Sequence, residues 1–272
     1  MIMSEAPQIQ QQSQPAIEQS QPVIMQSQQV AQSAAQSERK AKEYVIITDL
    51  NGTLIDSDQI MFDLIVGLLR GFGYEKKVKI VLEEALRGTS EEEAMRQIGV
   101  DDEKQKELEK VLYKELEEKK INLLPNAGKA LEDLQNEGFI FALATDLHHK
   151  YIIRLLNENN IQRFFREDLI FARDTFEFRK PSRNIVDEIF KRSGRGKGIV
   201  IGNSLKDVKM AANAEIPMIF LDCDQEASET NKEEEILTYY RKIKRERGGY
   251  ERISVVKDWI EIPKIIEGLT SH

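Results

Sequence analysis

Short runs of β-branched and aromatic residues alternate with amphipathic stretches along most of this chain, and this alternation is what most constrains its fold. The first run, YVIIT at 44–48, has the composition of a strand buried in a parallel sheet. Repeated strand–helix units favour an α/β fold with helices on both faces of a parallel sheet. Right-handed crossovers would then place the carboxyl ends of all strands at one edge, where such sheets bind ligands. The predicted strands are 44–48, 139–144, 168–172, 198–202, 217–221 and 252–256, and the predicted helices of these units are 127–137, 148–158, 182–193, 206–214 and 262–268.

A long segment with no strand signal interrupts this alternation directly after the first strand. Residues 56–121 show helical periodicity instead, as in the apolar face formed by Leu108, Leu112 and Leu116. We therefore expect an all-helical cap at 56–121, inserted into a core made of 44–55 and 122–272. The predicted cap helices are 57–72, 76–87, 90–98 and 101–120.

The first 43 residues differ in composition from the rest of the chain. Residues 1–37 are dominated by Gln, Ser, Ala and Pro and contain no aromatic residue. Such a segment buries too little apolar surface to offset its ordering entropy, so a disordered leader is predicted. Self-association through the Gln-rich tail is an alternative, and a solvated leader is favoured over it.

Charge and composition exclude several classes of protein. The net charge of −8 argues against a general nucleic-acid or membrane-surface binder, which needs a basic face. The single cysteine, Cys223, cannot form an internal disulfide, and no apolar stretch reaches 18 residues. No basic start followed by an apolar core marks a secretory signal. We expect a cytoplasmic protein with no membrane or nucleic-acid partner, and the sequence leaves its oligomeric state open.

Polar side chains gather where four of the predicted strands end. The stretches are Asp49–Leu54, Thr145-Asp146, Lys180-Pro181 and Gly202–Asp207. Together they offer a carboxylate nucleophile, a small hydroxyl for a phosphoryl oxygen, a charge-neutralising lysine and an acidic loop for a metal ion. This order and spacing predict a phosphoryl-transfer site.

The four stretches resemble the motifs of the haloacid dehalogenase-like (HAD) hydrolase superfamily. The first is similar to the nucleophile motif DxDGT[LV], and the others to the Ser/Thr, Lys and GDSxxD motifs of its phosphatases. Two connecting segments, 124–128 and 163–165, match as well. The resemblance spans about 44–221, is of the phosphoglycolate phosphatase-like type, and implies a Rossmann-like core.

The resemblance also implies a role for each matching residue. Asp49 would form an aspartyl-phosphate, and Thr145 would bind the transferred phosphoryl group. Lys180 would pair with that group and with Asp49, and Asp207 would orient the metal shell. The family's cofactor is normally Mg²⁺. The implied sites are Asp49, Asn51, Thr145 and Lys180 for catalysis, Gly52, Thr53, Thr145, Asp146 and Lys180 for phosphate, and Asp49, Asn51 (through its carbonyl), Asn203 and Asp207 for the metal.

Two asparagines depart from the family pattern. Asn51 stands where the phosphatases carry the aspartate that protonates the leaving oxygen, and an amide cannot titrate in that role. Asn203 replaces the first aspartate of the metal loop, and it offers an oxygen without a negative charge. Two functions therefore stay open: a Mg²⁺-dependent phosphohydrolase of a small phosphorylated metabolite, with full or impaired activity, or a non-catalytic binding or regulatory protein on the same fold.

Three further features have simple structural interpretations. Asp146 adds negative charge beside the predicted phosphate site. His148 and His149 are interpreted as exposed residues at a helix start, because a histidine metal site would need more ligands. Residues 232–247 are predicted to form a helix whose acidic start and basic end suit the helix dipole. A basic patch that steers a phosphorylated substrate is the less favoured interpretation of that helix.

Overall fold

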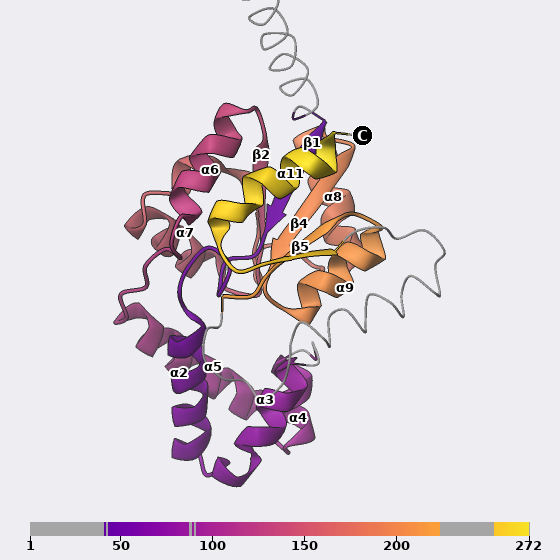
Figure 1. Cartoon of the computed structure of the whole chain (residues 1–272). Helices are drawn as coiled ribbons and strands as arrows, with labels where there is room; N and C mark the ends of the chain where they lie inside the picture. The colour runs from indigo at the N-terminus through magenta and orange to yellow at the C-terminus, as the bar shows by residue number, and fades with distance from the viewer. Residues whose placement is uncertain (1–40, 42, 87–88, 90, 224–252, 272) are drawn as a thin grey trace, which may run out of the picture.

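The computed structural model describes residues 41, 43–86, 89, 91–223 and 253–271. These residues form an α/β unit and a group of helices beyond one end of its sheet (Figure 1). Of the predicted leader, 1–43, residues 1–40 and 42 lie outside the described residues, as does the predicted helix 232–247. Ala41, inside the range assigned to the leader, is buried against the main apolar cluster.

The described strands form one six-stranded sheet in the order β3-β2-β1-β4-β5-β6, and every neighbouring pair is parallel. The predicted fold class, a Rossmann-like α/β sheet, is thus confirmed. The first strand along the chain lies near the centre, because the chain adds strands on one side of β1 and then on the other. The strands are β1 (Tyr44–Thr48), β2 (Ile140–Ala144), β3 (Phe165–Phe171), β4 (Lys197–Gly202), β5 (Met218–Leu221) and β6 (Ile253–Val256).

Both faces of this sheet are buried, which explains why its strands are continuously apolar. Along β1, Ile46 points into one cluster while Val45 and Ile47 point into the other. The first face is covered by α6 (Ala127–Asn136), α7 (His149–Glu158) and α11 (Ile262–Thr270), and the second by α8 (Arg183–Ser193) and α9 (Leu205–Ala214).

The segment after the first strand forms the helical insert that the sequence predicts. It lies at the end of the sheet where the strands terminate (Figure 1). A separate apolar cluster that includes Leu69, Ile98 and Leu108 holds it together. Its elements are α2 (Asp58–Gly71), η1 (Glu75–Lys77), α3 (Val78–Leu86), α4 (Glu91–Gln97) and α5 (Asp102–Glu117).

One predicted strand differs from the structure in extent. The range 168–172 misses the first residues of β3, which begins at Phe165. Residues 166–168 are charged and exposed on this edge strand, so they carry no apolar signal.

Among the helices that the structure describes, none combines the length and the apolar character needed to cross a membrane.

Candidate functional site

Asp49 lies at the carboxyl end of the central strand. Its N–H still donates to the carbonyl of Ile201 on β4 at 2.9 Å, so the backbone position is set by the sheet. Lys180 Nζ lies 2.9 Å from Asp49 Oδ1 and 2.9 Å from Asp207 Oδ1. The structure therefore brings together three residues that lie far apart in the sequence and follow different strands.

Burial controls the electrostatics of this cluster. It raises the pKa of Asp49 to about 7, with a further rise from the charge of Asp207, although Lys180 and the Leu50 N–H oppose it. Burial opposes protonation of Lys180, but the carboxylates of Asp207, Asp49 and Asp146 raise its pKa. One cationic lysine thus faces more buried negative charge than it can neutralise.

Asp207 is held at the start of α9 by a capping box. Its Oδ2 accepts from the Ser204 N–H at 3.1 Å and from Ser204 Oγ at 2.6 Å. Its other oxygen accepts from Lys180 Nζ at 2.9 Å. Both carboxylate oxygens of Asp207 are thus engaged, and these contacts fix its position relative to Lys180 and to Ser204.

Asn51 is oriented by a residue at the entrance to the insert. Ser57 Oγ donates to Asn51 Oδ1 at 3.2 Å and accepts from the Gly52 N–H at 3.2 Å. Ser57 is fully buried. The amide of Asn51 is therefore fixed in the turn where the family carries a titrating carboxylate.

Asn203 links the loop after β4 to the turn after β1 and to the insert. Its Oδ1 accepts from Thr53 Oγ1 at 3.4 Å, and its Nδ2 donates to Asp58 Oδ2 at 2.9 Å. Gly52 has a φ of +63°, and a Cβ there would overlap Asn203 Nδ2 and both carboxylate oxygens of Asp58. Only glycine fits where these groups converge.

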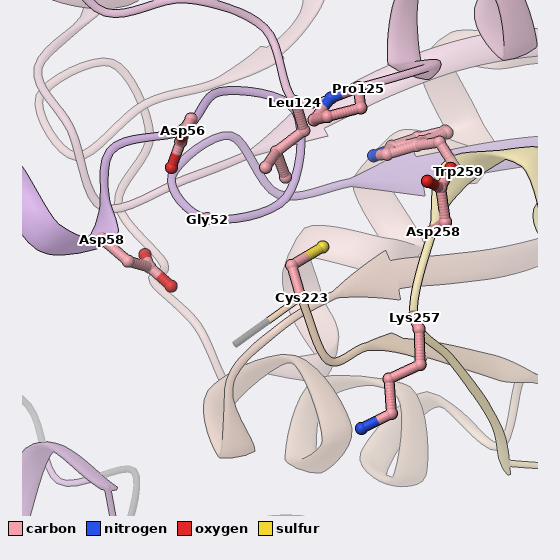
Figure 2. Close-up of a pocket in the computed structure, with 9 residues that line it drawn as sticks. All are labelled: Gly52, Asp56, Asp58, Leu124, Pro125, Cys223, Lys257, Asp258 and Trp259. Carbon is pink, nitrogen blue, oxygen red and sulfur yellow. The ribbon is translucent and has the colours of Figure 1, made fainter. Parts of the chain in front are cut away.

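A cavity of about 250 Å³ adjoins the turn after β1, and Gly52, Asp58, Cys223 and Trp259 help to line it (Figure 2). Trp259 is buried, and its Nε1 donates to the carbonyl of Thr53 at 2.5 Å. This contact fastens the turn to the segment that follows β6.

Thr145 and Asp146 end the neighbouring strand β2. The Thr145 N–H donates to the carbonyl of Phe171 at 3.1 Å, and its Oγ1 accepts from the Leu147 N–H at 3.4 Å. Asp146 Oδ2 accepts from Lys206 Nζ at 2.8 Å. Burial would raise the pKa of Asp146, but Lys180 and Lys206 lower it, so its charge is compensated locally.

The interpretation of His148 as an exposed residue is wrong. Its side chain is half-buried, with Nε2 3.0 Å from Glu109 Oε1 on α5 and Nδ1 3.3 Å from Asp174 Oδ2. Its ring also packs edge-on against Tyr113 at 4.7 Å between centroids. These contacts with Glu109 and Tyr113 of α5 join the insert to the start of α7 in the core.

The oxygen donors at this site fit a hard divalent cation. Mg²⁺ commonly binds through one or two carboxylates and several waters. Asp49, the carbonyl at position 51 and Asn203 Oδ1 would supply the protein ligands, and the excess buried carboxylate charge favours a cation. No group of three His, Cys, Asp or Glu residues is arranged to hold a metal within the described part of the chain, so amide and carbonyl oxygens would have to complete the set.

Several residues that lie at the site were not predicted from the sequence. Ser57 and Asp58 had a local signal, a small hydroxyl and an acid at a helix start. Lys206 lies within the fourth motif. Arg173 and Arg179, which contact Glu92 of the insert, and Trp259, which contacts Thr53, have no local signal, because their partners are distant in the sequence.

Comparison with known proteins places the chain in a family. A model of the haloacid dehalogenase-like hydrolases matches residues 46–221. A phosphoglycolate phosphatase of Agrobacterium fabrum is 33% identical over 97 residues, 35% of this chain and 41% of the relative. A phosphoglycolate phosphatase of Vibrio cholerae is 28% identical over 104 residues, 38% of this chain and 45% of the relative. These alignments span less than half of either relative.

The fold is also similar to that of solved structures. A family IA HAD hydrolase of Entamoeba histolytica superimposes with a TM-score of 0.63 at 17% identity, over 84% of this chain and 100% of that one. At this identity the likeness shows the fold alone. Because the family model covers well over half of the sequence, the chain belongs to the haloacid dehalogenase-like hydrolases.

Proposed function

We propose that this protein is a Mg²⁺-dependent phosphohydrolase that acts on a small phosphorylated metabolite through an aspartyl-phosphate on Asp49. The observation that carries the proposal is Lys180 Nζ lying 2.9 Å from both Asp49 and Asp207 in a buried site at the carboxyl edge of the sheet. The phosphoglycolate phosphatases among the relatives support a phosphoester substrate.

In this reaction a carboxylate oxygen of Asp49 attacks phosphorus while the bond to the ester oxygen breaks, and the leaving oxygen takes its proton from solvent water. Lys180 and Thr145 would hold the phosphoryl oxygens, and the lysine would offset their charge. Water then cleaves the acyl phosphate, releasing inorganic phosphate and restoring the carboxylate. A bound Mg²⁺ would supply charge neutralisation to the phosphoryl oxygens.

Asn51 supports a second candidate, a non-catalytic binding or regulatory protein. Its amide accepts from Ser57 and cannot give a proton to the leaving oxygen. Loss of a general acid–base group costs about 10²–10⁴-fold in rate. A leaving group that departs without a proton would suffer least.

The two candidates differ in one assay. The full chain is incubated with Mg²⁺ and a panel of alkyl, aryl and acyl phosphates, and phosphate release is measured beside an Asp49→Asn variant. Turnover that disappears in Asp49→Asn supports the phosphohydrolase. A folded protein that binds phosphoesters and releases no phosphate from any of them supports the non-catalytic candidate.

A further inference from the structure

A second cavity, of about 400 Å³, lies between α4 of the insert and the catalytic edge of the core. Lys180 and Asp146 line it, so it adjoins the proposed phosphoryl site. Five of its seven lining side chains are cationic and two are acidic. Its volume is in the range of small-molecule sites, about 300–1,000 Å³.

Two arginines of the core converge on one carboxylate of the insert. Arg173 Nη2 lies 2.7 Å from Glu92 Oε1, and Arg179 Nη1 contacts the same oxygen. Arg173 also lies 3.3 Å from Glu109 Oε1. The side chains of Arg173 and Glu92 are only 16% and 25% exposed.

The charge state of Glu92 follows from these contacts. Burial alone would raise its pKa, but a hydrogen bond from its own backbone N–H and the charges of Arg173 and Arg179 lower it. Glu92 therefore presents an anionic oxygen to two guanidinium groups, which are suited to carboxylate and phosphate oxygens.

We propose that Arg173 and Arg179 form a subsite for a second anionic group on the substrate, and that Glu92 occupies this subsite as an internal competitor when no substrate is bound. The inference rests on the proposed function, because it assigns the substrate class of the same site: phosphoesters that carry a carboxylate or a second phosphate. Glu92 belongs to the insert and the arginines to the core, so an arriving anion would replace a contact between the two parts.

The alternative explanation is a latch that only holds the insert on the core. The two explanations predict different effects when the charge of Glu92 is removed. If Glu92 is a competitor, its loss should increase the affinity for ligands with a second anion and leave the affinity for other ligands unchanged. If Glu92 is only a latch, its loss should change the affinity for both kinds of ligand together.

The test uses non-hydrolysable phosphonates, so that binding is measured apart from turnover. Calorimetry on the full chain in Mg²⁺ gives the Kd of 3-phosphonopropionate, propane-1,3-diphosphonate and the neutral-tailed 3-hydroxypropylphosphonate. The first two differ in whether the second anion is a carboxylate or a phosphonate. The variants are Glu92→Gln, Arg179→Gln and, as a control, Glu103→Gln, whose side chain is exposed on α5.

We expect Glu92→Gln to lower the Kd of at least one probe with a second anion by about tenfold, which corresponds to about one charge-assisted hydrogen bond. The Kd of the neutral-tailed probe should be unchanged. Arg179→Gln should weaken the same probe by a similar factor, and Glu103→Gln should leave all three unchanged. Equal changes for all probes in Glu92→Gln, no change at all, or failure of all three phosphonates to bind would each overturn the subsite.

Failure of the subsite and failure of the proposed function give different results. Hydrolysis of simple phosphoesters without selectivity for a second anion refutes the subsite alone. Selectivity that depends on Arg179 and Glu92 in a protein that hydrolyses no phosphoester refutes the phosphohydrolase and retains the subsite.

Discussion

Asn203 Nδ2 donates a hydrogen bond to Asp58 Oδ2 at 2.9 Å, joining the loop after β4 to the first turn of the insert. The amide oxygen, Asn203 Oδ1, accepts from Thr53 Oγ1. An aspartate at position 203 could still accept from Thr53, but it could not donate to Asp58. The side chain of Asn203 therefore compensates the carboxylate of Asp58, and we expect its replacement to change both stability and metal binding.

We predict that Asn203→Asp lowers the free energy of unfolding by roughly 1–2 kcal/mol in metal-free buffer, because a donor is lost and two carboxylates face each other. Added Mg²⁺ should recover this loss and bind more tightly than in the native protein, since ligand binding stabilises the folded state. Melting curves with and without Mg²⁺, together with calorimetry, measure both effects.

The control for this prediction is the double variant Asp58→Asn/Asn203→Asp, which should regain stability without metal. An unchanged Mg²⁺ affinity in Asn203→Asp would show that position 203 does not face the cation.

A carboxyl group at position 51 should restore the missing proton donor, because it can carry a proton in the required pH range. Asn51→Asp keeps the acceptor for Ser57 Oγ, so the turn should be retained. We expect hydrolysis of alkyl phosphates to rise by up to about 10²–10⁴-fold, and hydrolysis of aryl phosphates to rise less, because a phenolate leaves without a proton. Rates for a matched alkyl and aryl pair test this. If Asn51→Asp instead slows turnover of a substrate that the native protein accepts, the chemistry does not use this carboxylate.

Gly52 should be intolerant of a side chain for two separable reasons. Gly194 provides the matched control, since it has a similar φ of +69° but no heavy atom within 4 Å of the point that a Cβ would occupy. Gly194→Ala should therefore cost only the left-handed backbone penalty, about 1–2 kcal/mol. Gly52→Ala should cost more and should disturb the site, because its Cβ would overlap Asn203 and Asp58. Chemical denaturation of both variants, with phosphonate binding as a second readout, tests the difference; equal losses would exclude the steric term.

Trp259 should act as a positioning residue for the nucleophile turn. Trp259→Phe removes the donor to the buried carbonyl of Thr53, and an unsatisfied carbonyl costs roughly 1–3 kcal/mol. We expect lower stability and a lower kcat with a smaller change in KM, because the displaced turn carries Asp49. Ile260→Ala is the neighbouring control, since Ile260 is 70% exposed. If stability falls in Trp259→Phe while kcat is unchanged, the contact serves packing alone.

Much of the fold and part of the site could be predicted from local sequence. The apolar runs of β1, β2, β4 and β5 and the periodicity of the insert were sufficient to expect a parallel sheet interrupted by helices. The strand ends then located Asp49, Thr145, Lys180 and Asp207, because parallel strands present their carboxyl ends at one edge. The start of β3 was missed, since its charged residues lie on an exposed edge strand.

The sequence by itself determined the order of strands and helices and the residue types at the strand ends, because backbone hydrogen bonding and side-chain periodicity act over a few residues. Tertiary structure alone decided that Asn203 meets Asp58, that Trp259 holds Thr53, and that Arg173 and Arg179 meet Glu92. These pairs are separated by 81 to 206 positions and join elements that become neighbours only after the sheet forms and the insert packs over its edge. Each contact depends on the direction of a side chain to within an ångström or so, and no local pattern of residues encodes that direction.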